Sequence, residues 1–486
     1  MAKFFDTQIT QYIKNPWRKD IDLDEIAMQE FDYETISLQL LTWKWEYSLQ
    51  SLSSKKLWDF VWEKLYLIQK LKENNHISDS DLKLLNEIDF PLIEVLAQIE
   101  NTWVKVDQEI LSQTWEFLRN EIKSEESQIY QLAWKEFNIS SPKQVWEILF
   151  DELGLPSWKK TKTGYSVDIE VLESLSFKYP IAKHILNYRQ YSKLLSTYVE
   201  WLQKMINKNT NRIHTNYNQT ITSTWRLSST NPNLQNIPSS SSWVSSEIRK
   251  AFVPFEKDDV LMSFDYSQIE VRLLAIMSED ENLIHAFEND IDIHKNTWKF
   301  IFWTDDLLPE QRKIAKAVNF WVIYWISGFW LSKMIWISQA DAKIYIEKFY
   351  ETYPKVKTYF ENVISSCQET GYVQTLFWRK RYIAWINDKN SMIQKAASRE
   401  AINMPIQWTS ADIIKIAMIK IFKFLKQNNL KSEIIMQVHD ELVFNVKKDE
   451  IDLLKTKIPD IMENIISSSV KLKVWMWIWT NWKDAK

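Results

Sequence analysis

The sequence predicts an α+β protein built from several domains. Between about residues 88 and 207, apolar residues recur at helical spacing over long stretches such as "FPLIEVLAQIENT" and "PIAKHILNYRQYSKLLSTYVEWLQKMI". In contrast, "DVLMSFDY" and "SEIIMQVHDELVFNV" are short apolar runs of the kind that form strands, and the second is broken by an acidic turn. A chain of 486 residues is long enough for about three domains.

The elements follow one another along the chain in a recognisable order. Residues 1–85 are polar and mixed, with helices expected around 8–14, 24–30 and 55–73. The helices of 88–207 are interrupted by a short helix and the basic loop "SWKKTKTGY", and residues 229–246 form a Ser/Asn/Pro-rich loop. A strand then enters a helix at "DVLMSFDYSQIEVRLLAI", and further helices are expected in "QRKIAKAVNFWVIYW" and, with a polar interruption, in "SREAINMPIQWTSADIIKIAMIKIFKFL".

Composition limits the compartment and leaves the partners open. The chain is 45% hydrophobic and 26% charged, which is typical of a soluble globular protein. A net charge of -4 does not exclude nucleic acid, because such binding depends on local basic patches. Cys367 is the single cysteine, so no intrachain disulfide can form. With no apolar signal core and no run of about 18 apolar residues, we predict a soluble cytoplasmic protein.

Glycine and tryptophan usage is abnormal. The chain has 4 Gly and 26 Trp, whereas an average composition of about 7% would give roughly 34 Gly. Tryptophan also stands where turns favour glycine, as in "NPWRKD" and "LPSWKKT". Glycine is used where φ is positive or where backbones approach closely, and an indole does neither cheaply. We therefore predict that most of these positions are glycine in the protein as its source makes it, with UGA read as glycine. A genuinely Trp-rich protein is the alternative.

Three acidic residues stand at the ends of apolar β runs. Asp265 ends "VLMSFD", and Asp440 and Glu441 lie in the turn of "IIMQVHDELVFNV". If these strands are neighbours, the carboxylates converge and can hold two Mg²⁺ ions, an arrangement suited to in-line phosphoryl transfer. Taken singly, each Asp is equally compatible with ordinary turn chemistry.

Two further groups of residues have both a functional and a structural interpretation. Arg312, Lys316, Phe320 and Tyr324 recur every four residues, so two cations and two rings share one helix face that can bind a triphosphate and a base. An amphipathic helix with snorkelling basic side chains is the structural alternative. The loop "RLSSTNPNLQNIP" carries Arg226 and several amides suited to the minor groove and sugar-phosphate, although turn chemistry also favours such residues.

Four segments together resemble the signature motifs of family A DNA polymerases. They are "RLSSTNPNLQNIP", "DYSQIEVRLLA", "RKIAKAVNFWVIYW" and "QVHDELVF", in the family's order, and the likeness extends from about residue 5 to the end. The resemblance implies a right-hand polymerase fold with an antiparallel palm sheet and helical fingers and thumb. The implied domains are an inactive, truncated 3′–5′ exonuclease-like remnant (1–87), thumb (88–207), palm (208–270 and 436–486) and fingers (271–435).

The resemblance also implies site residues. Asp265 and Asp440 would bind two Mg²⁺ with the backbone carbonyl of Tyr266, and Glu441 and Lys316 would complete the catalytic set. The residues implied to bind the incoming dNTP are Arg312, Lys316, Phe320, Tyr324, His294, Gln268 and the steric gate Glu270. Those implied to contact primer–template DNA are Arg226, Asn233, Gln235, Asn403, Gln407 and His439.

Departures from the family pattern matter as much as the likeness. The early exonuclease carboxylate motifs have no residues here, and near "DFVWEKLYLIQKL" Lys64 stands without the expected Asp, so we expect no proofreading. The family has glycine where this chain has Trp at 321, 325, 330, 225, 378, 408, 43 and 45, whereas Trp482 matches a true family Trp. We expect a monomeric, nucleoid-associated DNA polymerase; the alternatives are a catalytically silent DNA-binding scaffold and a single-subunit RNA polymerase.

Overall fold

A computed structural model describes most of the chain. The described residues are 5–17, 22–42, 52–74, 77–157, 159–161, 164–237, 243–302, 314–316, 318, 322, 327–335 and 337–482. Within these ranges, no helix combines the length and the apolar composition needed to cross a membrane.

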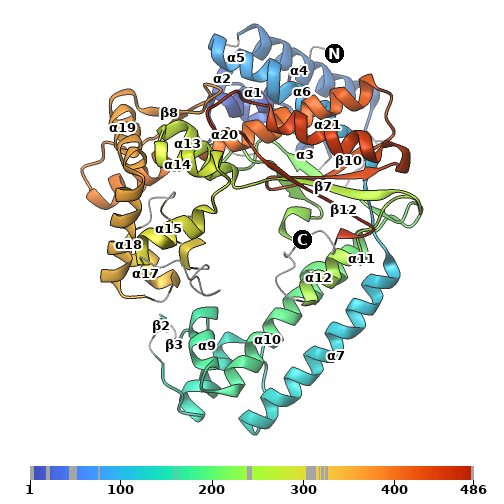
Figure 1. Ribbon diagram of the computed structural model, residues 1–486. Helices are drawn as coiled ribbons and strands as arrows, with labels where there is room; N and C mark the ends of the chain where they lie inside the picture. The colour runs from blue at the N-terminus through green and yellow to red at the C-terminus, as the bar shows by residue number, and fades with distance from the viewer. Residues whose placement is uncertain are drawn as a thin grey trace.

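A four-stranded antiparallel sheet lies at the centre of the molecule (Figure 1), with the strand order β10-β11-β7-β12. Its strands are β7 (Val260–Tyr266), β10 (Glu433–Val438), β11 (Glu441–Val446) and β12 (Val474–Trp479). Side chains alternate between its faces. Met262 and Phe264 belong to the large core shared with the helices behind the sheet, and Leu261 belongs to a second core on the other face. Asp265 therefore lies on the same face as Leu261, away from the helices behind the sheet.

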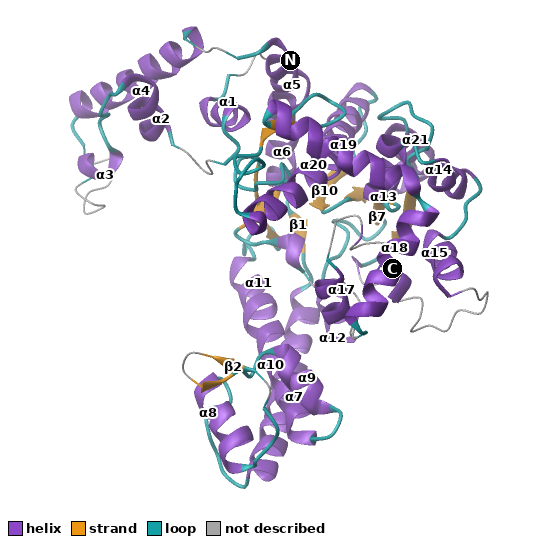
Figure 2. Cartoon of the chain, turned by 90° about the vertical axis from the view of Figure 1, so that its left-hand side faces the viewer, coloured by secondary structure: helices purple, strands orange, loops and turns teal. Residues whose placement is uncertain are grey.

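The N-terminal part is helical, as predicted. Its elements are α1 (Thr7–Lys14), α2 (Leu23–Phe31), α3 (Leu38–Leu41), α4 (Ser54–Glu73), α5 (Asp79–Leu84), η2 (Leu85–Asp89) and α6 (Phe90–Thr102). Polar side chains cap the first helices: Asp6 accepts the N–H of Ile9, and Asp22 accepts that of Glu25. Helices α2 to α4 project away from the sheet (Figure 2), whereas α6 packs against α20 and β10.

Two long helices lie within residues 88–207, the predicted thumb, and extend away from the sheet in Figure 1. These are α7 (Gln108–Ala133) and α10 (Pro180–Leu194), which pack against each other. The smaller elements are β1 (Val104–Lys105), α8 (Pro142–Trp146), η3 (Glu147–Glu152), β2 (Lys160–Thr161), β3 (Gly164–Tyr165), α9 (Ile169–Ser176), η4 (Leu195–Val199) and α11 (Glu200–Met205). The basic loop forms the β2–β3 hairpin, where Lys159 lies 2.5 Å from Asp168 and 3.0 Å from Glu170, so part of its charge is neutralised within the chain.

The predicted fingers contain α13 (Ile269–Ser278), α14 (Glu281–Glu288), α15 (Ile293–Phe302), α17 (Gly328–Ile335), α18 (Gln339–Thr352), α19 (Pro354–Thr370), β8 (Tyr372–Gln374), β9 (Lys380–Tyr382) and α20 (Ser391–Gln427). The remaining elements are β4 (Arg212–Ile213), β5 (Asn216–Asn218), β6 (Ser228–Thr230), η5 (Leu234–Asn236), α12 (Trp243–Lys250), η6 (Lys448–Glu450) and α21 (Ile451–Glu463).

Local expectations fail in two places. Residues 229–246 are not one loop, because they include the end of β6, all of η5 and the start of α12 at Trp243. Helix α20 continues through the expected interruption, with Pro405 inside it. A proline removes one backbone N–H donor, but Ile402 and Ile406 on either side are buried in the core and hold the helix in place.

Four of the described tryptophans have left-handed backbones: Trp103 (φ 67°), Trp134 (φ 57°), Trp225 (φ 58°) and Trp378 (φ 63°). A β-carbon disfavours this conformation, and glycine adopts it freely. At Trp103 the ring centroid lies 2.5 Å from that of His214, whereas packed aromatic rings are usually about 4.5–7 Å apart. These backbones are shaped for glycine, which supports the prediction that several tryptophan positions are glycine in the protein as made.

Candidate active site

Asp265 and Asp440 lie side by side at one end of the sheet. Strands β11 and β7 pair antiparallel with Glu441 opposite Asp265. Asp440 precedes Glu441 in the two-residue turn between β10 and β11, and its carbonyl accepts the N–H of Tyr266 at 3.1 Å. Paired residues on adjacent antiparallel strands have Cα atoms about 4.5–5.5 Å apart. The fold therefore brings together two acidic positions that are distant along the chain.

Glu441 shares the sheet face of Asp265 but is held inward. Directly opposite residues of an antiparallel pair point to the same side. Glu441 is buried, and its Oε1 accepts a hydrogen bond from Ser263 Oγ at 2.5 Å. Ser263 lies two residues before Asp265 on β7, on the same face. Glu441 therefore lies next to the two aspartates, buried against the sheet.

The electrostatics of the site favour an added cation. Burial, together with the neighbouring charges of Glu270 and Asp265, raises the pKa of the Asp440 carboxyl to about 6, against the opposing effect of Arg226. Ser410 Oγ donates to Asp440 Oδ1 at 3.4 Å, a long hydrogen bond that compensates little. A carboxylate crowded in this way releases its proton more readily when a metal ion lies beside it.

A chain of hydrogen bonds supports the Asp440 turn. Tyr217 is buried, and its hydroxyl contacts both the N–H (2.9 Å) and the carbonyl (3.1 Å) of Gln437. The Gln437 amide donates to the carbonyl of His439 at 2.5 Å and accepts from Gln235 Nε2 at 2.7 Å. His439 itself has a left-handed backbone, with φ of 53°. The predicted DNA-contact residues Gln235 and His439 are thus linked directly to the turn that carries Asp440.

Arg226 and Glu270 form an ion pair at the edge of the site, with 2.6 Å between Arg226 Nη2 and Glu270 Oε1. Gln268 is exposed at the N-cap of α13, and Asn233 caps η5 by accepting the N–H of Gln235 at 3.0 Å. The ring of Tyr266 turns away into the core, where its hydroxyl donates to the carbonyl of Met462 at 2.8 Å. Only the backbone of Tyr266 therefore remains at the predicted metal position.

One face of α20 is directed toward the Asp440 turn. Asn403, Gln407 and Ser410 are spaced i, i+4 and i+7, so they share a helix face. Ser410 contacts Asp440, which places the other two along the same line. Within the described residues, Asn403 Oδ1 is buried without a hydrogen-bond partner, and an unsatisfied amide at this position is available to an external donor.

Several predicted residues cannot be placed. Arg312, Phe320 and Tyr324 lie outside the described residues, as does the side chain of His294. Lys316 is described in a short helical segment and is exposed. Sequence reasoning missed Ser263, Ser410, Tyr217 and Gln437. The i+7 spacing from Asn403 could have indicated Ser410, whereas the contacts of the others depend on the pairing of distant segments.

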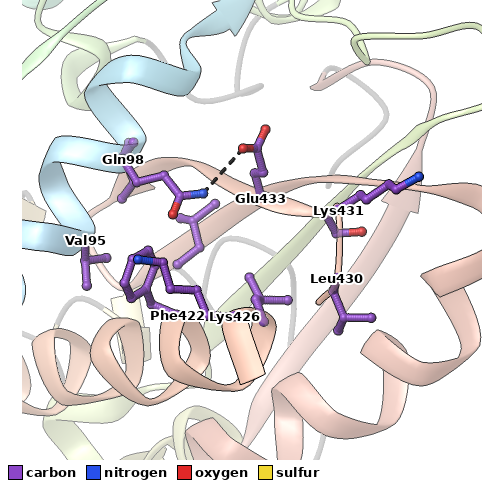
Figure 3. A pocket seen from close by; sticks show the side chains of 11 residues that line it. Val95, Gln98, Phe422, Lys426, Leu430, Lys431 and Glu433 are labelled. Atoms are coloured by element: carbon purple, nitrogen blue, oxygen red, sulfur yellow. Dashed lines mark hydrogen bonds between the residues drawn. The ribbon is translucent and has the colours of Figure 1, made fainter. Parts of the chain in front are cut away.

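A separate small pocket lies at the far end of β10 (Figure 3), with a volume of about 100 Å³. Val95 and Gln98 of α6 line it together with Phe422, and Gln98 Nε2 donates to Glu433 Oε1 at 3.4 Å. Glu433 begins β10 and Asp440 follows its end, so a strand length of roughly 20 Å separates this pocket from the aspartates. It is not part of the candidate site.

Comparison with known proteins identifies the class to which this fold and site belong. The model of DNA polymerase family A matches residues 108–484, so the chain belongs to that family. It is 41% identical to DNA polymerase I of Bacillus subtilis and 44% identical to that of Caldicellulosiruptor bescii, in each case over 99% of this chain and 55% of the relative. The chain thus spans about half the length of these relatives.

A solved structure is also similar. The POL domain of Pol1 from M. smegmatis, in complex with DNA primer-template and dNTP, superposes with a TM-score of 0.86 and 34% identity, covering 99% of this chain and 82% of the other. The predicted family and right-hand polymerase fold are therefore confirmed.

The donors at the site fit Mg²⁺. Two carboxylates and a backbone carbonyl are hard oxygen ligands, and Mg²⁺ commonly uses one or two carboxylates together with substrate phosphates. Among the described residues, no group of three or more His, Cys, Asp or Glu side chains is arranged to hold a metal ion unaided.

Proposed function

We propose that this chain is a template-directed DNA polymerase, which adds dNTPs to a primer 3′-hydroxyl in DNA replication and repair. The observation that carries the proposal is the pairing of β7 with β11, which sets Asp265 beside Asp440 in a chain of family A. The similar M. smegmatis domain is in complex with primer-template and dNTP, and we extend those two substrates to this chain.

Asp265, Asp440 and the carbonyl of Tyr266 would hold two Mg²⁺. Bound there, the ions would activate the attacking hydroxyl and neutralise the leaving pyrophosphate. Arg312 and Lys316 would hold the triphosphate, with His294 and Gln268 beside it. Phe320 would pack on the sugar, and Tyr324 would occupy the template-base position until the site closes.

Glu270 would act as the steric gate against a 2′-hydroxyl. Its carboxylate is fixed by the 2.6 Å ion pair with Arg226 and is mostly buried. A side chain held in this way can exclude an added oxygen, because the pair would have to separate before the carboxylate could move.

Primer–template DNA would lie across the same edge. Arg226, Asn233, Gln235 and His439 would contact the strands near the terminal pair from the palm side, and Asn403 and Gln407 would do so from α20. We propose that the protein works as a monomer in the nucleoid. Its thumb would be residues 88–207, its palm 208–270 and 436–486, and its fingers 271–435. Two of these boundaries fit the elements poorly, because α6 lies inside the first range but packs against α20 and β10, and the last boundary falls inside β10.

We further propose that the chain does not proofread and that residues 1–87 are an exonuclease-like remnant. Lys64, at the position where the family motif has an acidic residue, forms an ion pair with Asp24. A 3′-mismatched primer should therefore persist during incubation without dNTPs, and efficient removal of its terminal base would contradict the proposal.

Extension of a labelled primer with Mg²⁺ and dNTPs tests the main function, with Asp265→Ala as the control. The wild type should extend the primer, and the variant should lose on the order of 10³-fold in rate while it still binds the duplex. If the wild type binds DNA with no extension, the scaffold alternative is correct. If it extends equally well with ribonucleotides, the RNA polymerase alternative is favoured.

A further inference from the structure

Four charged side chains are packed together in the interior behind the site. Asp89, Arg379, Asp412 and Lys415, called here the buried quartet, each have side-chain exposures of 0–1%. They come from three separate parts of the chain: Asp89 ends η2, Arg379 immediately precedes β9, and Asp412 and Lys415 lie one turn apart on α20. Such a burial of charge is expensive unless every member is paired.

Every member of the buried quartet is paired. Arg379 Nη1 lies 2.9 Å from Asp89 Oδ2, and its Nε donates to Asp412 Oδ1 at 2.9 Å. Lys415 Nζ donates to Asp89 Oδ1 at 3.2 Å. The Coulombic pull of Asp412 and Asp89 outweighs burial and raises the pKa of Arg379. The formal charges of the two aspartates, the arginine and the lysine sum to zero, and a series of hydrogen bonds connects the group to the site.

The buried quartet fixes the hairpin that contains Arg379. Thr375 Oγ1 donates to Asp412 Oδ2 at 3.3 Å and accepts the N–H groups of Phe377 and Arg379, both at 3.2 Å. The β8–β9 hairpin is thus anchored on α20 by its turn. Two residues after Arg379, Arg381 extends from the same hairpin, and its Nη1 donates to the carbonyl of Ser223 at 2.6 Å.

Ser223 belongs to a short loop that carries Arg226. The loop is closed on itself, because Thr222 Oγ1 donates to the carbonyl of Arg226 at 2.5 Å. From the other side, the hydroxyl of Tyr12 donates to the carbonyl of Thr222. With its backbone held at these points, the loop directs the long Arg226 side chain onto Glu270.

We propose that the buried quartet, acting through Arg381, is a positioning device that holds Arg226 against Glu270 beside Asp440. Arg226 is 36% exposed and its side chain has many rotamers. A fixed backbone is what limits those rotamers to the one that meets Glu270. Through Asp89, the N-terminal helices are also connected to the buried quartet. The positions of α6, the β8–β9 hairpin and α20 are therefore all coupled to that of Arg226. The inference rests on the proposed polymerase function.

A double-mutant cycle separates positioning from general stability. Arg381→Met breaks the link to Ser223, together with the ion pair between Arg381 and Glu400, and leaves the buried quartet intact. Asp412→Asn unbalances the quartet itself. Displacement of a catalytic group by about 1 Å can cost on the order of 10²-fold, so we expect each variant to lower kcat for primer extension at least tenfold. In an Arg226→Ala background, each should lower kcat less than threefold, because the positioned group is already absent. Arg381→Lys retains a donor and should restore kcat to within threefold of the wild type.

The matched control is Lys447→Met. Lys447 pairs with Asp259 at 2.8 Å, and Asp259 is 6% exposed. The pair lies at the opposite end of β7 from Asp265, so its loss should change kcat less than twofold in either background. Equal losses for Arg381→Met with and without Arg226 would overturn the inference. If Asp412→Asn fails to fold by circular dichroism, the Arg381 cycle decides alone. Wild-type primer extension tests the polymerase function separately, before any variant is compared.

Discussion

Trp134 offers a clean test of whether the tryptophan positions were built for glycine. It is the C-terminal cap of α7, with φ of 57° and ψ of 20°, and its side chain is 90% exposed. Removal of the indole therefore costs almost no buried contact, and the main effect on stability comes from the left-handed backbone conformation of residue 134. We compare Trp134→Gly with Trp134→Ala, which both delete the indole and differ only in the β-carbon.

The expected difference follows from the backbone. A β-carbon in the left-handed region costs roughly 1–2 kcal/mol, and the greater freedom of glycine in the unfolded chain offsets part of this. Trp134→Gly should therefore be more stable than Trp134→Ala by about 1 kcal/mol. Glycine is also the residue that most often ends helices in this way.

For Trp115, on the same helix, we expect the opposite order of stability between the glycine and alanine variants. It lies in the interior of α7, where glycine is less stable than alanine by about 1 kcal/mol. Urea unfolding followed by far-ultraviolet circular dichroism measures both pairs. If glycine is less stable than alanine at both positions, the reasoning about residue 134 fails. Mass spectrometry of the protein from its native source then identifies the residue that is actually present.

Three other changes have defined outcomes. Asp440→Asn should abolish primer extension yet stabilise the metal-free protein at pH 7.5 by about 1–3 kcal/mol. The pKa of Asp440 in the folded protein is raised to about 6, so the stability of the wild type falls as pH rises through that value. In thermal melts the two proteins should therefore be equally stable below about pH 4. Glu270→Ala should raise ribonucleotide incorporation relative to dNTP by on the order of 10²-fold, and unchanged selectivity in single-nucleotide insertion would remove Glu270 from the gate. Trp482→Gly should destabilise the fold by about 3–5 kcal/mol, since this side chain is fully buried and stacks 4.1 Å from the Arg249 guanidinium. An unchanged free energy of unfolding in urea would mean that the indole of Trp482, like that of Trp134, contributes nothing to stability.

Local pattern was enough to predict the elements that carry the site. The apolar run ending in Asp265 and the two runs around Asp440 predicted β7, β10 and β11, and helical periodicity predicted α7, α10 and α20. The pairing of β7 with β11 was a different matter, because nothing in either segment specifies a neighbour so far away along the chain. The resemblance to a family supplied that pairing, and the register of Glu441 opposite Asp265 confirms it.

The supporting interactions could not be predicted from the sequence. Asp412 and Lys415 resemble the solvated face of a helix, and Arg379 resembles a surface turn residue, yet all three are buried. Their partners are separated by tens to hundreds of residues, and a charge is buried only where its partner arrives. Likewise, the start of α12 was hidden by the serines that precede it, which favour turns when read alone.

Trp225 is a tryptophan with a left-handed backbone that directly precedes a residue of the candidate site. The Trp225 ring lies 4.0 Å from the Arg379 guanidinium, a contact worth about 0.5–2 kcal/mol. Against this stand a left-handed backbone, at about 1–2 kcal/mol, and a buried indole N–H with no partner among the described residues, at about 1–3 kcal/mol. These two costs offset the contact with Arg379, but the indole is also fully buried and packs against Tyr12 and Trp408, so Trp225→Gly in this chain would leave a cavity and lose about 3–5 kcal/mol of packing. The next residue is Arg226, so the residue that the source inserts at 225 also sets the backbone from which the Arg226–Glu270 pair is built.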